Sequence, residues 1–334
     1  MQYKQLGHTG LMVSELCFGA MTFGGRGFWE VIGQQGQDVA DNLVAQSIDA
    51  GINFFDTANV YSEGHSEEIL GKALASRRHE VVIATKVRGR MSNHPNGIGL
   101  SRVHMMEQVN KSLERLGTDY IDLYQIHGFD PITPFDEILR TMDDLVTSGK
   151  VRYIGCSNLA AWQLMKALGR SELHQWVRFE SLQAYYTLVG RDLEREVVPL
   201  LKDQNLGLMV WSPLAGGLLT DKFHQNQQGP EGARRTTFDF PPVNRDRLPG
   251  VLNALAEVAK NHDVSMAQVA LAWLLHQDVV TSVIIGAKNS EQLADNLNAP
   301  DLTLTEDDLT QLNEASALPP EYPGWMVEMQ SGDR

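Results

Sequence analysis

The sequence predicts an α/β fold in which eight parallel strands close into a (β/α)8 barrel, the TIM-barrel architecture. Three observations support this prediction. Short apolar runs alternate with longer helical patterns along the chain, which is typical of a parallel sheet. Eight such strand–helix units can be counted, the number that closes a barrel. The length of 334 residues is normal for one barrel, so we expect a single domain over residues 1–334.

An open doubly wound sheet is the alternative fold for such a pattern. It usually has fewer strands and carries a G-x-G-x-x-G fingerprint after the first one. Here the first strand is followed by GAMTFGG, residues 19–25, which is glycine-rich but does not match that fingerprint. A long loop rather than a helix comes next, and this favours the barrel.

The expected strands are the apolar runs that lie between turn and helix signals. They cover residues 11–19, 52–56, 81–86, 120–127, 151–156, 177–184, 207–212 and 281–285. Ser66 is expected to cap a helix with acids in its first turn, and Ser101 to open a helix that Gly117 ends. Two further helices are expected to end before Gly51 and Gly149.

Two features decorate the predicted barrel. Residues 1–10 are expected to form a small hairpin that closes the barrel bottom. Residues 213–248 form a long loop after strand seven, about 36 residues that include Gly, Pro, Asn and Arg. Connections of that length are uncommon in compact domains, so this loop is expected to be functional or mobile.

The composition narrows the classes of partner and the compartment. Acidic residues outnumber basic ones, 42 to 28, and the net charge of −14 argues against nucleic acid or an anionic membrane as partner. Cys17 and Cys156 lie in apolar runs and give no disulfide framework, which is typical of a reducing cytoplasm. The N-terminus has no apolar signal core, and no run approaches the roughly 20 apolar residues of a membrane span. We therefore expect a soluble, cytoplasmic protein.

Polar side chains end several of the predicted strands. Strand two ends in Asp56, strand three in Lys86 and strand four in His127. In such barrels the carboxyl ends of the strands meet at the face that carries the chemistry. A charge at the end of a buried strand is costly unless it is paired, and Lys86 on the adjacent strand is the natural partner of Asp56.

Tyr61 follows Asp56 in the next loop and is expected to reach over the same rim. A free phenol has a pKa near ~10, and the ammonium of Lys86 is expected to lower the pKa of Tyr61 and make it a tuned general acid. His127 is expected to donate a hydrogen bond to the same substrate oxygen. Each residue alone also fits a structural role, such as a turn cap, an ion pair, a core histidine or packing. Together they indicate proton delivery to a carbonyl.

These residues lie in segments that resemble the aldo-keto reductase superfamily. The segments are GINFFDTANVYSEGHSEEILGKAL, VVIATK, YIDLYQIH, GCSN, VWSPLAGG and IIGAKNSEQLADNL, in that order along the chain. The resemblance covers essentially the whole chain, and the chain is similar in these segments to microbial NADP-dependent members of the superfamily. It implies a (β/α)8 barrel, NADPH as the usual cofactor without a Rossmann domain, and Asp56, Tyr61, Lys86 and His127 as catalytic tetrad.

The resemblance also implies a set of cofactor-binding residues. On the rim and around the nicotinamide these are Gly19, Met21, Thr22, Asp56, Ser157, Asn158, Gln183 and Trp211, with Trp211 stacking on the ring. Over the pyrophosphate they are Ser212, Pro213, Leu214, Ala215, Gly216 and Lys222. At the adenosine end they are Gly286, Lys288, Gln292, Asp295 and Asn296.

One position departs from the pattern of several characterised branches, which place an Arg where this chain has Gln292. That Arg helps to hold the 2′-phosphate of NADPH, and here Lys288 is expected to replace it at the start of a helix that Ser290 caps. Arg234 and Arg235 in the long loop are candidates to supplement or replace Lys288. NADPH is therefore expected to be preferred over NADH.

The substrate is expected to be a small aldehyde or ketone. Phe23, Trp29 and Phe129 are expected to wall an apolar substrate pocket, with the C-terminal tail from residue 320 reaching its mouth; plain surface packing is equally compatible. Two other functions remain open. One is a cofactor-binding redox sensor with little turnover, as in the potassium-channel β subunits, which resemble this family. The other, a metal-dependent barrel hydrolase, needs an H-x-H at the end of strand one, where this chain reads LCFGAM, so no metal is expected.

Overall fold

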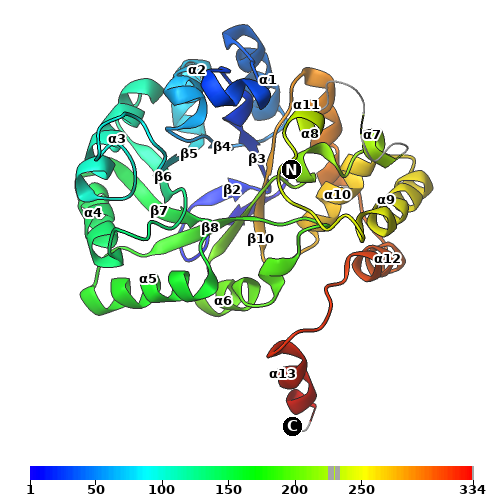
Figure 1. The fold of residues 1–334 in the computed structure, drawn as a ribbon. Helices are drawn as coiled ribbons and strands as arrows, with labels where there is room; N and C mark the ends of the chain where they lie inside the picture. The colour runs from blue at the N-terminus through cyan, green and yellow to red at the C-terminus, as the bar shows by residue number, and fades with distance from the viewer. Residues whose placement is uncertain (225–228, 230–233, 333–334) are drawn as a thin grey trace.

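A computed structural model describes residues 1–224, 229 and 234–332. Eight strands form a closed barrel, and each pairs in parallel with both neighbours (Figure 1). They are β3 (Leu16–Gly19), β4 (Phe54–Asp56), β5 (Val82–Val87), β6 (Ile121–Ile126), β7 (Val151–Ser157), β8 (Phe179–Tyr185), β9 (Gly207–Trp211) and β10 (Val280–Ile285). Because β10 pairs with β3, the sheet has no open edge, and the predicted (β/α)8 barrel is confirmed.

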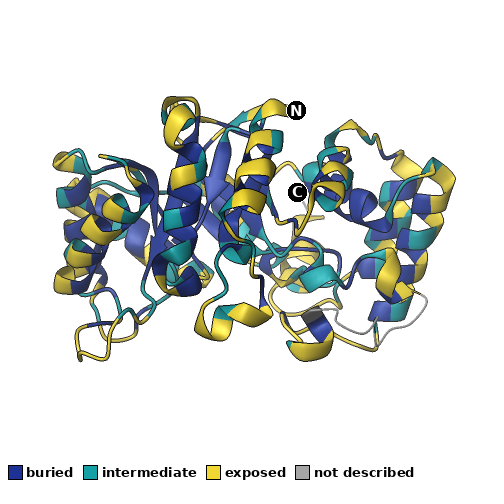
Figure 2. Cartoon of the chain, turned by 90° about the horizontal axis from the view of Figure 1, so that it is seen from above, coloured by how far each residue is buried: buried dark blue, intermediate teal, exposed yellow. Residues whose placement is uncertain are grey.

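Helices surround the barrel on its outer side. They are α1 (Gln37–Asp49), α2 (His65–Leu74), α3 (Arg102–Leu116), α4 (Phe135–Thr147), α5 (Ala161–His174), α6 (Val197–Gln204), α9 (Leu248–His262), α10 (Met266–Leu275), α11 (Ser290–Leu297) and α12 (Glu306–Ser316). In α4, Phe135, Ile138, Leu139, Met142 and Leu145 are buried, which is the spacing of one helix face. Figure 2 shows this pattern, with exposed residues on the outer sides of the helices and a buried sheet within.

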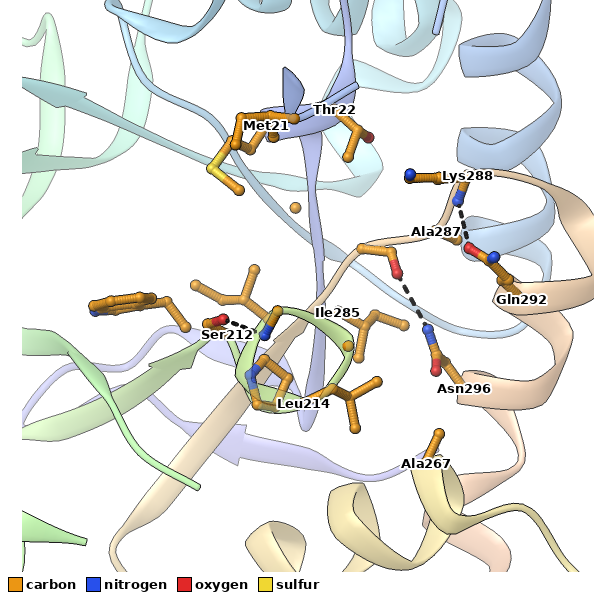
Figure 3. Close-up of a pocket in the computed structure, with 18 of the residues that line it drawn as sticks. Met21, Thr22, Ser212, Leu214, Ala267, Ile285, Ala287, Lys288, Gln292 and Asn296 are labelled. Atoms are coloured by element: carbon orange, nitrogen blue, oxygen red, sulfur yellow. Dashed lines mark hydrogen bonds between the residues drawn. The ribbon is translucent and has the colours of Figure 1, made fainter. Parts of the chain in front are cut away.

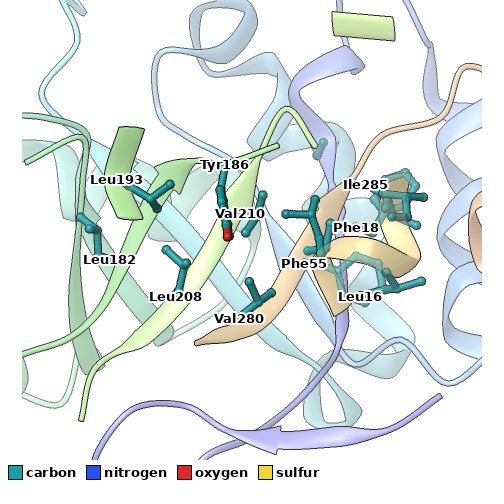
Figure 4. Packing of buried hydrophobic residues seen from close by; sticks show 14 of the residues in the cluster. Leu16, Phe18, Phe55, Leu182, Tyr186, Leu193, Leu208, Val210, Val280 and Ile285 are labelled. Carbon is teal, nitrogen blue, oxygen red and sulfur yellow. The ribbon is translucent and has the colours of Figure 1, made fainter. Parts of the chain in front are cut away.

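Alternation along the strands sorts the core into two parts. Leu16 and Phe18 on β3 point outward to the helices with Phe55 on β4, as Figure 4 shows. Cys17 and Phe54 point into the barrel, in a separate cluster. Since side chains alternate with a period of two, Asp56 shares the inner face with Phe54. The same rule puts Lys86 and His127 on the inner face of their strands or just beyond it.

A hairpin closes the amino end of the barrel. β1 (Tyr3–Gln5) pairs antiparallel with β2 (Met12–Ser14), and Leu6 and Val13 from the hairpin are fully buried with the inner cluster. The predicted hairpin therefore exists, but its second strand lies beyond residue 10, and the predicted strand 11–19 is split into β2 and β3. Gly7 is required at the turn because it has φ +55° and a Cβ there would lie 2.1 Å from the carbonyl oxygen of Glu180.

The helix boundaries test the local signals. Ser101 caps α3 by accepting from His104 N, and Gly117 ends it with φ +63°, as predicted. Gly51 and Gly149 follow α1 and α4 with positive φ, also as predicted. The prediction for Ser66 is wrong: α2 begins at His65 after Gly64, and the Ser66 hydroxyl instead donates to Ala20 O.

The long loop after β9 and the tail complete the chain. The described part of the loop contains η6 (Ala215–Gly217), α7 (Asp221–His224) and α8 (Arg234–Thr237). The tail ends in α13 (Gly324–Ser331), which lies away from the barrel in Figure 1 and has no buried residue. The expectation that the tail reaches the cavity is not met by its described residues, since none of those after 296 lines it. Among the described residues, no helix combines the length and the apolarity needed to cross a bilayer.

Candidate active site

A buried ion pair lies at the carboxyl end of the barrel. Lys86, from β5, is fully buried; its Nζ pairs with Asp56 on β4 and donates to Thr57 O at 2.8 Å. Burial alone would lower the pKa of Lys86, but the charge of Asp56 and the contact with Tyr61 outweigh it and raise the pKa above its ordinary value. Lys86 is therefore a fixed cation behind the cavity, held in place by Asp56 as the sequence indicated.

Tyr61 stands in front of this pair. It opens η3 (Tyr61–Gly64), is buried, and its ring centroid lies 5.1 Å from Lys86 Nζ. Burial raises the pKa of Tyr61 above its ordinary value, and Lys86 offsets only part of this rise. The expectation of a lowered pKa is thus wrong, because desolvation of the phenolate outweighs the attraction of the ammonium. Tyr61 is a neutral phenol at neutral pH and has a proton to give.

The loop that carries Tyr61 is held in an unusual conformation. Ser62, Glu63 and Gly64 all have positive φ, at 48°, 58° and 95°. The Ser62 hydroxyl donates to Phe23 O at 2.8 Å and accepts from Gly25 N at 2.9 Å, which ties this loop to the one after β3. Strained backbone of this kind persists only where its surroundings fix it, so Tyr61 is rigidly placed.

His127 directly follows β6, and its ring centroid lies 5.6 Å from that of Tyr61. Burial, with Lys86 and Arg88 nearby, lowers the pKa of His127 to about 3. The imidazole is therefore neutral at physiological pH and can donate one hydrogen bond rather than a charge. The structure brings Asp56, Tyr61, Lys86 and His127 together, as the sequence predicted.

Two amides extend the cluster inside the barrel. Asp56 Oδ2 accepts from Gln183 Nε2 at 2.9 Å and from Gln125 Nε2 at 3.2 Å, while Gln183 Nε2 also lies 3.4 Å from Gln125 Oε1. Gln125 was missed from the sequence. Its position two residues before His127, on the same face of β6, is the signal that could have found it.

A second group surrounds Trp211 at the end of β9. Asn158, with φ +55°, accepts from Trp211 Nε1 at 3.0 Å and donates to Ser157 Oγ at 2.9 Å. Ser157 in turn donates to the backbone carbonyl oxygen of Gln183 at 2.9 Å. The indole of Trp211 is thus fixed in its plane, and it stacks on Phe240 with centroids 5.9 Å apart and planes 6° from parallel.

A cavity of about 980 Å³ joins these groups to α11. It runs between the rim of β3, the loop after β9 and the start of α11; Figure 3 shows Met21, Thr22, Ser212, Leu214, Lys288 and Gln292 around it. The predicted residues that line it are Gly19, Met21, Thr22, Trp29, Asp56, Tyr61, His127, Ser157, Asn158, Gln183, Trp211, Ser212, Pro213, Leu214, Gly216, Lys222, Gly286, Lys288, Gln292, Asp295 and Asn296.

The α11 end of the cavity is more open. Lys288 is exposed, and its backbone N–H donates to Gln292 Oε1 at 3.0 Å. Asn289, not Ser290 as predicted, caps α11 by accepting from Gln292 N at 2.9 Å. The ammonium of Lys288 forms no ion pair within the described part of the chain.

Both carboxylate oxygens of Asp295 are already hydrogen-bonded within the protein. Its two oxygens accept from Ser265 Oγ at 2.9 Å and from Gln268 Nε2 at 2.6 Å, which joins α11 to α10. Asp295 lines the cavity, but its hydrogen bonds are those of a residue that fixes α11 in place.

Three predicted residues lie elsewhere. Phe23 is fully buried against Phe18, with centroids 5.7 Å apart, and Phe129 packs on Phe135 and Trp162. Neither is among the lining residues, so of the predicted aromatic walls only Trp29 lines the cavity. Ala215 is also fully buried and outside the lining.

Aromatic rings from the two long loops line the cavity together with Trp29. The ring centroids of Trp29 and Tyr61 lie 4.9 Å apart, those of Phe28 and Phe238 lie 5.3 Å apart, and Phe240 stacks on Trp211. The loops after β3 and β9 therefore meet at the cavity, and their apolar rings favour an uncharged ligand at this end.

Of the two arginines predicted in the long loop, the structure describes the side chain of Arg235 alone. The side chain of Arg234 lies outside the described residues. Arg235 is buried, donates to Ala215 O at 2.7 Å and to Pro241 O at 2.9 Å, and pairs with Asp239. Arg235 does not line the cavity, so its proposed phosphate contact is replaced by a structural one that braces the loop.

Comparison with known proteins agrees with this geometry. The family model "Aldo/keto reductase family" matches residues 15–317. The chain is similar to an uncharacterized oxidoreductase of Bacillus subtilis, with 39% identity over 94% of this chain and 95% of the relative. It is 37% identical to a putative aryl-alcohol dehydrogenase of Schizosaccharomyces pombe, over 93% and 95% of the two chains. A putative voltage-gated potassium channel subunit beta of the same yeast is 36% identical, over 93% and 92%.

The matched span holds the barrel, the ion pair and the cavity in one continuous stretch. Members of this family are oxidoreductases that act on small carbonyl compounds with nicotinamide cofactors. The chain belongs to the aldo/keto reductase family.

Proposed function

We propose that this protein reduces aldehydes or ketones to alcohols with NADPH, with Tyr61 as proton donor. The observation that carries the proposal is a buried, neutral phenol that lines the cavity in front of a fixed cation. When bound, the nicotinamide supplies the hydride that reaches the carbonyl carbon. Tyr61 gives its proton to the carbonyl oxygen, and the alcohol leaves.

The remaining tetrad members support that proton transfer. Lys86 stabilises the phenolate that Tyr61 leaves behind, and Asp56 keeps Lys86 protonated and in place. His127 is neutral, so it can donate a hydrogen bond to the carbonyl oxygen without repelling Lys86. Tyr61 regains its proton from solvent after turnover.

The residues present fit a dinucleotide. The Oγ1 atom of Thr22 is buried without a hydrogen-bond partner among the described residues, on a residue that lines the cavity. Gln183 lines the cavity, and its side-chain oxygen, Oε1, accepts no hydrogen bond among the described residues. Trp211 offers a fixed ring beside these groups for the nicotinamide. The cavity volume of about 980 Å³ is at the upper end of the usual range for ligand sites.

Lys288 supports the choice of NADPH. It lies two residues before the eight-residue helix α11 on an exposed turn that Gln292 and Asn289 hold. An ammonium at a helix N-terminus suits a phosphate, and charge-assisted contacts of this kind contribute about 1.5–3 kcal/mol. The cytoplasmic location, and the exclusion of nucleic acid and membrane as partners, remain predictions from composition.

Steady-state oxidation of NADPH with a panel of aliphatic and aromatic aldehydes and ketones tests the proposal. We expect multiple turnovers with several members of the panel and formation of the matching alcohol. Tight binding of NADPH without turnover on any carbonyl would instead support a redox sensor. That second candidate is favoured by the similarity to a protein named as a potassium channel β subunit, while the complete tetrad favours turnover.

A further inference from the structure

Gln125 lies beneath the cavity and has no part in the proposed proton transfer. It is fully buried on β6, opposite Lys86 in the register of the β5–β6 pair. Its amide bridges two side chains that do have a part: Nε2 donates to Asp56 Oδ2, and Oε1 accepts from Gln183 Nε2. Buried amides are retained only where their hydrogen bonds are made, and here both polar atoms are bonded.

These contacts leave one orientation for the amide of Gln183. An ion-paired carboxylate can only accept, so Asp56 requires N–H groups from both glutamines. The second N–H of Gln183 Nε2 then points to Gln125 Oε1, 3.4 Å away. With both N–H groups bonded below the rim, the Gln183 oxygen is left on the cavity side as an acceptor.

We propose that Gln125 is a positioning residue that fixes the Gln183 oxygen as the acceptor for the N–H₂ of the nicotinamide carboxamide. This inference rests on the proposed function, because it assigns the group that Gln183 recognises. Asp56 holds one N–H of Gln183 and Gln125 holds the other, so without Gln125 a single contact opposes rotation of the Gln183 amide by half a turn. The rotated amide presents an N–H₂ to another N–H₂, which is repulsive. Gln125 therefore acts on cofactor recognition through Gln183 and touches neither cofactor nor substrate.

A cofactor that lacks the N–H₂ separates this role from general disruption. The probes are NADPH and the reduced 3-acetylpyridine analogue of NADP, in which a methyl ketone replaces the carboxamide. Dissociation constants are measured by fluorescence titration for wild type and for Gln125→Met, which keeps the side-chain length without hydrogen bonds. We expect Gln125→Met to weaken NADPH binding by about threefold to tenfold, the size of one neutral hydrogen bond, and to leave the analogue nearly unchanged.

A matched control and a second variant at position 125 separate a specific effect on Gln183 from the general loss of a buried glutamine. Gln108 is also a buried glutamine, and among the described residues its side chain makes one hydrogen bond, which it accepts from Asn59, but it lies on α3 outside the barrel. The ratio that is compared is the dissociation constant of the analogue divided by that of NADPH. Gln108→Met should leave this ratio at the wild-type value. Gln125→Glu, when protonated, can still donate to Asp56 and accept from Gln183, so its ratio should be near wild type at low pH. The ionised carboxylate still accepts from Gln183, so the ratio should stay near wild type at higher pH, while its repulsion of Asp56 weakens the binding of both dinucleotides alike.

Wild type, titrated over the same range, is the reference for the other groups that face this position, namely Asp56, Lys86 and Tyr61. Equal losses for both dinucleotides in Gln125→Met, or a ratio in Gln125→Glu as low as that in Gln125→Met, would overturn the inference. Failure of the wild-type protein to bind either dinucleotide would reject the proposed function itself.

Discussion

The two ends of the cavity hold their lysines in opposite surroundings. Lys86 is fully buried, paired with Asp56 and bonded to a backbone carbonyl. Lys288 is exposed, and its ammonium forms no ion pair within the described residues. Burial strengthens every electrostatic contact at the first end, while solvent and salt screen those at the second. The same residue type is therefore expected to control catalysis at one end and only cofactor preference at the other.

The largest expected effect is at the buried end, on Tyr61. Tyr61→Phe removes the transferred proton and keeps the ring, so we expect carbonyl reduction to fall by about 10²–10⁴-fold. Binding of NADPH, followed by fluorescence, should be nearly unchanged. Reduction at a near wild-type rate, with normal cofactor binding, would contradict the assignment of the proton donor.

Lys86→Met is expected to affect both turnover and stability. It removes the cation that stabilises the Tyr61 phenolate and leaves Asp56 unpaired inside the barrel. Loss of one partner of a buried pair typically costs about 3–5 kcal/mol of unfolding free energy, measurable by denaturant titration. The control is the double variant Lys86→Met with Asp56→Asn, which should regain part of the stability but none of the activity. A double variant no more stable than the single one would show that the pair is not the source of the loss.

Trp211→Ala tests a contact that depends on ring area rather than charge. We expect NADPH and NADH binding to weaken alike, by about tenfold, since stacking contributes about 0.5–1.5 kcal/mol beyond buried area. Trp211→Phe keeps a ring but loses the hydrogen bond to Asn158, so its loss should be smaller. A loss confined to one of the two dinucleotides would mean that Trp211 reads the phosphate end.

The smallest expected effect is at the exposed end. Lys288→Ala should weaken NADPH binding by about tenfold with little change for NADH, and more strongly at low salt. Lys222→Ala is the comparison: this exposed lysine also lines the cavity, and because it is predicted to lie over the pyrophosphate that both dinucleotides share, its loss should weaken both alike. Equal losses of both dinucleotides, or none, would place recognition of the 2′-phosphate elsewhere.

The strand pattern predicted the barrel and the positions of Asp56, Lys86 and His127, because both follow from short-range periodicity. Alternation puts Asp56 on the inner face of β4, and equal strand ends bring Lys86 and His127 beside it. Loop side chains follow no such period. Phe23 and Phe28 lie in the same loop, yet one is core and the other lines the cavity.

The direction of the pKa shift of Tyr61 could not be predicted from the sequence, for a different reason. Its direction depends on the balance between burial and the charge of Lys86, and only the folded packing gives the first of these. The predicted cap of α11 was wrong by a single residue, Ser290 in place of Asn289, because both residue types are good caps. Gln125 was missed because a glutamine inside an apolar strand gains meaning only from its partners across the barrel.

The central claim is that Tyr61 is a neutral phenol because burial outweighs the attraction of Lys86. Phenolate absorbance, titrated from about pH 6 to about pH 10 in wild type and Tyr61→Phe, tests it directly, since an ordinary tyrosine ionises near ~10. We predict that the difference between the two proteins reaches no midpoint within this range, because burial raises the pKa of Tyr61 above its ordinary value. A phenolate signal that is lost in Tyr61→Phe and has its midpoint below about 9 would contradict the account.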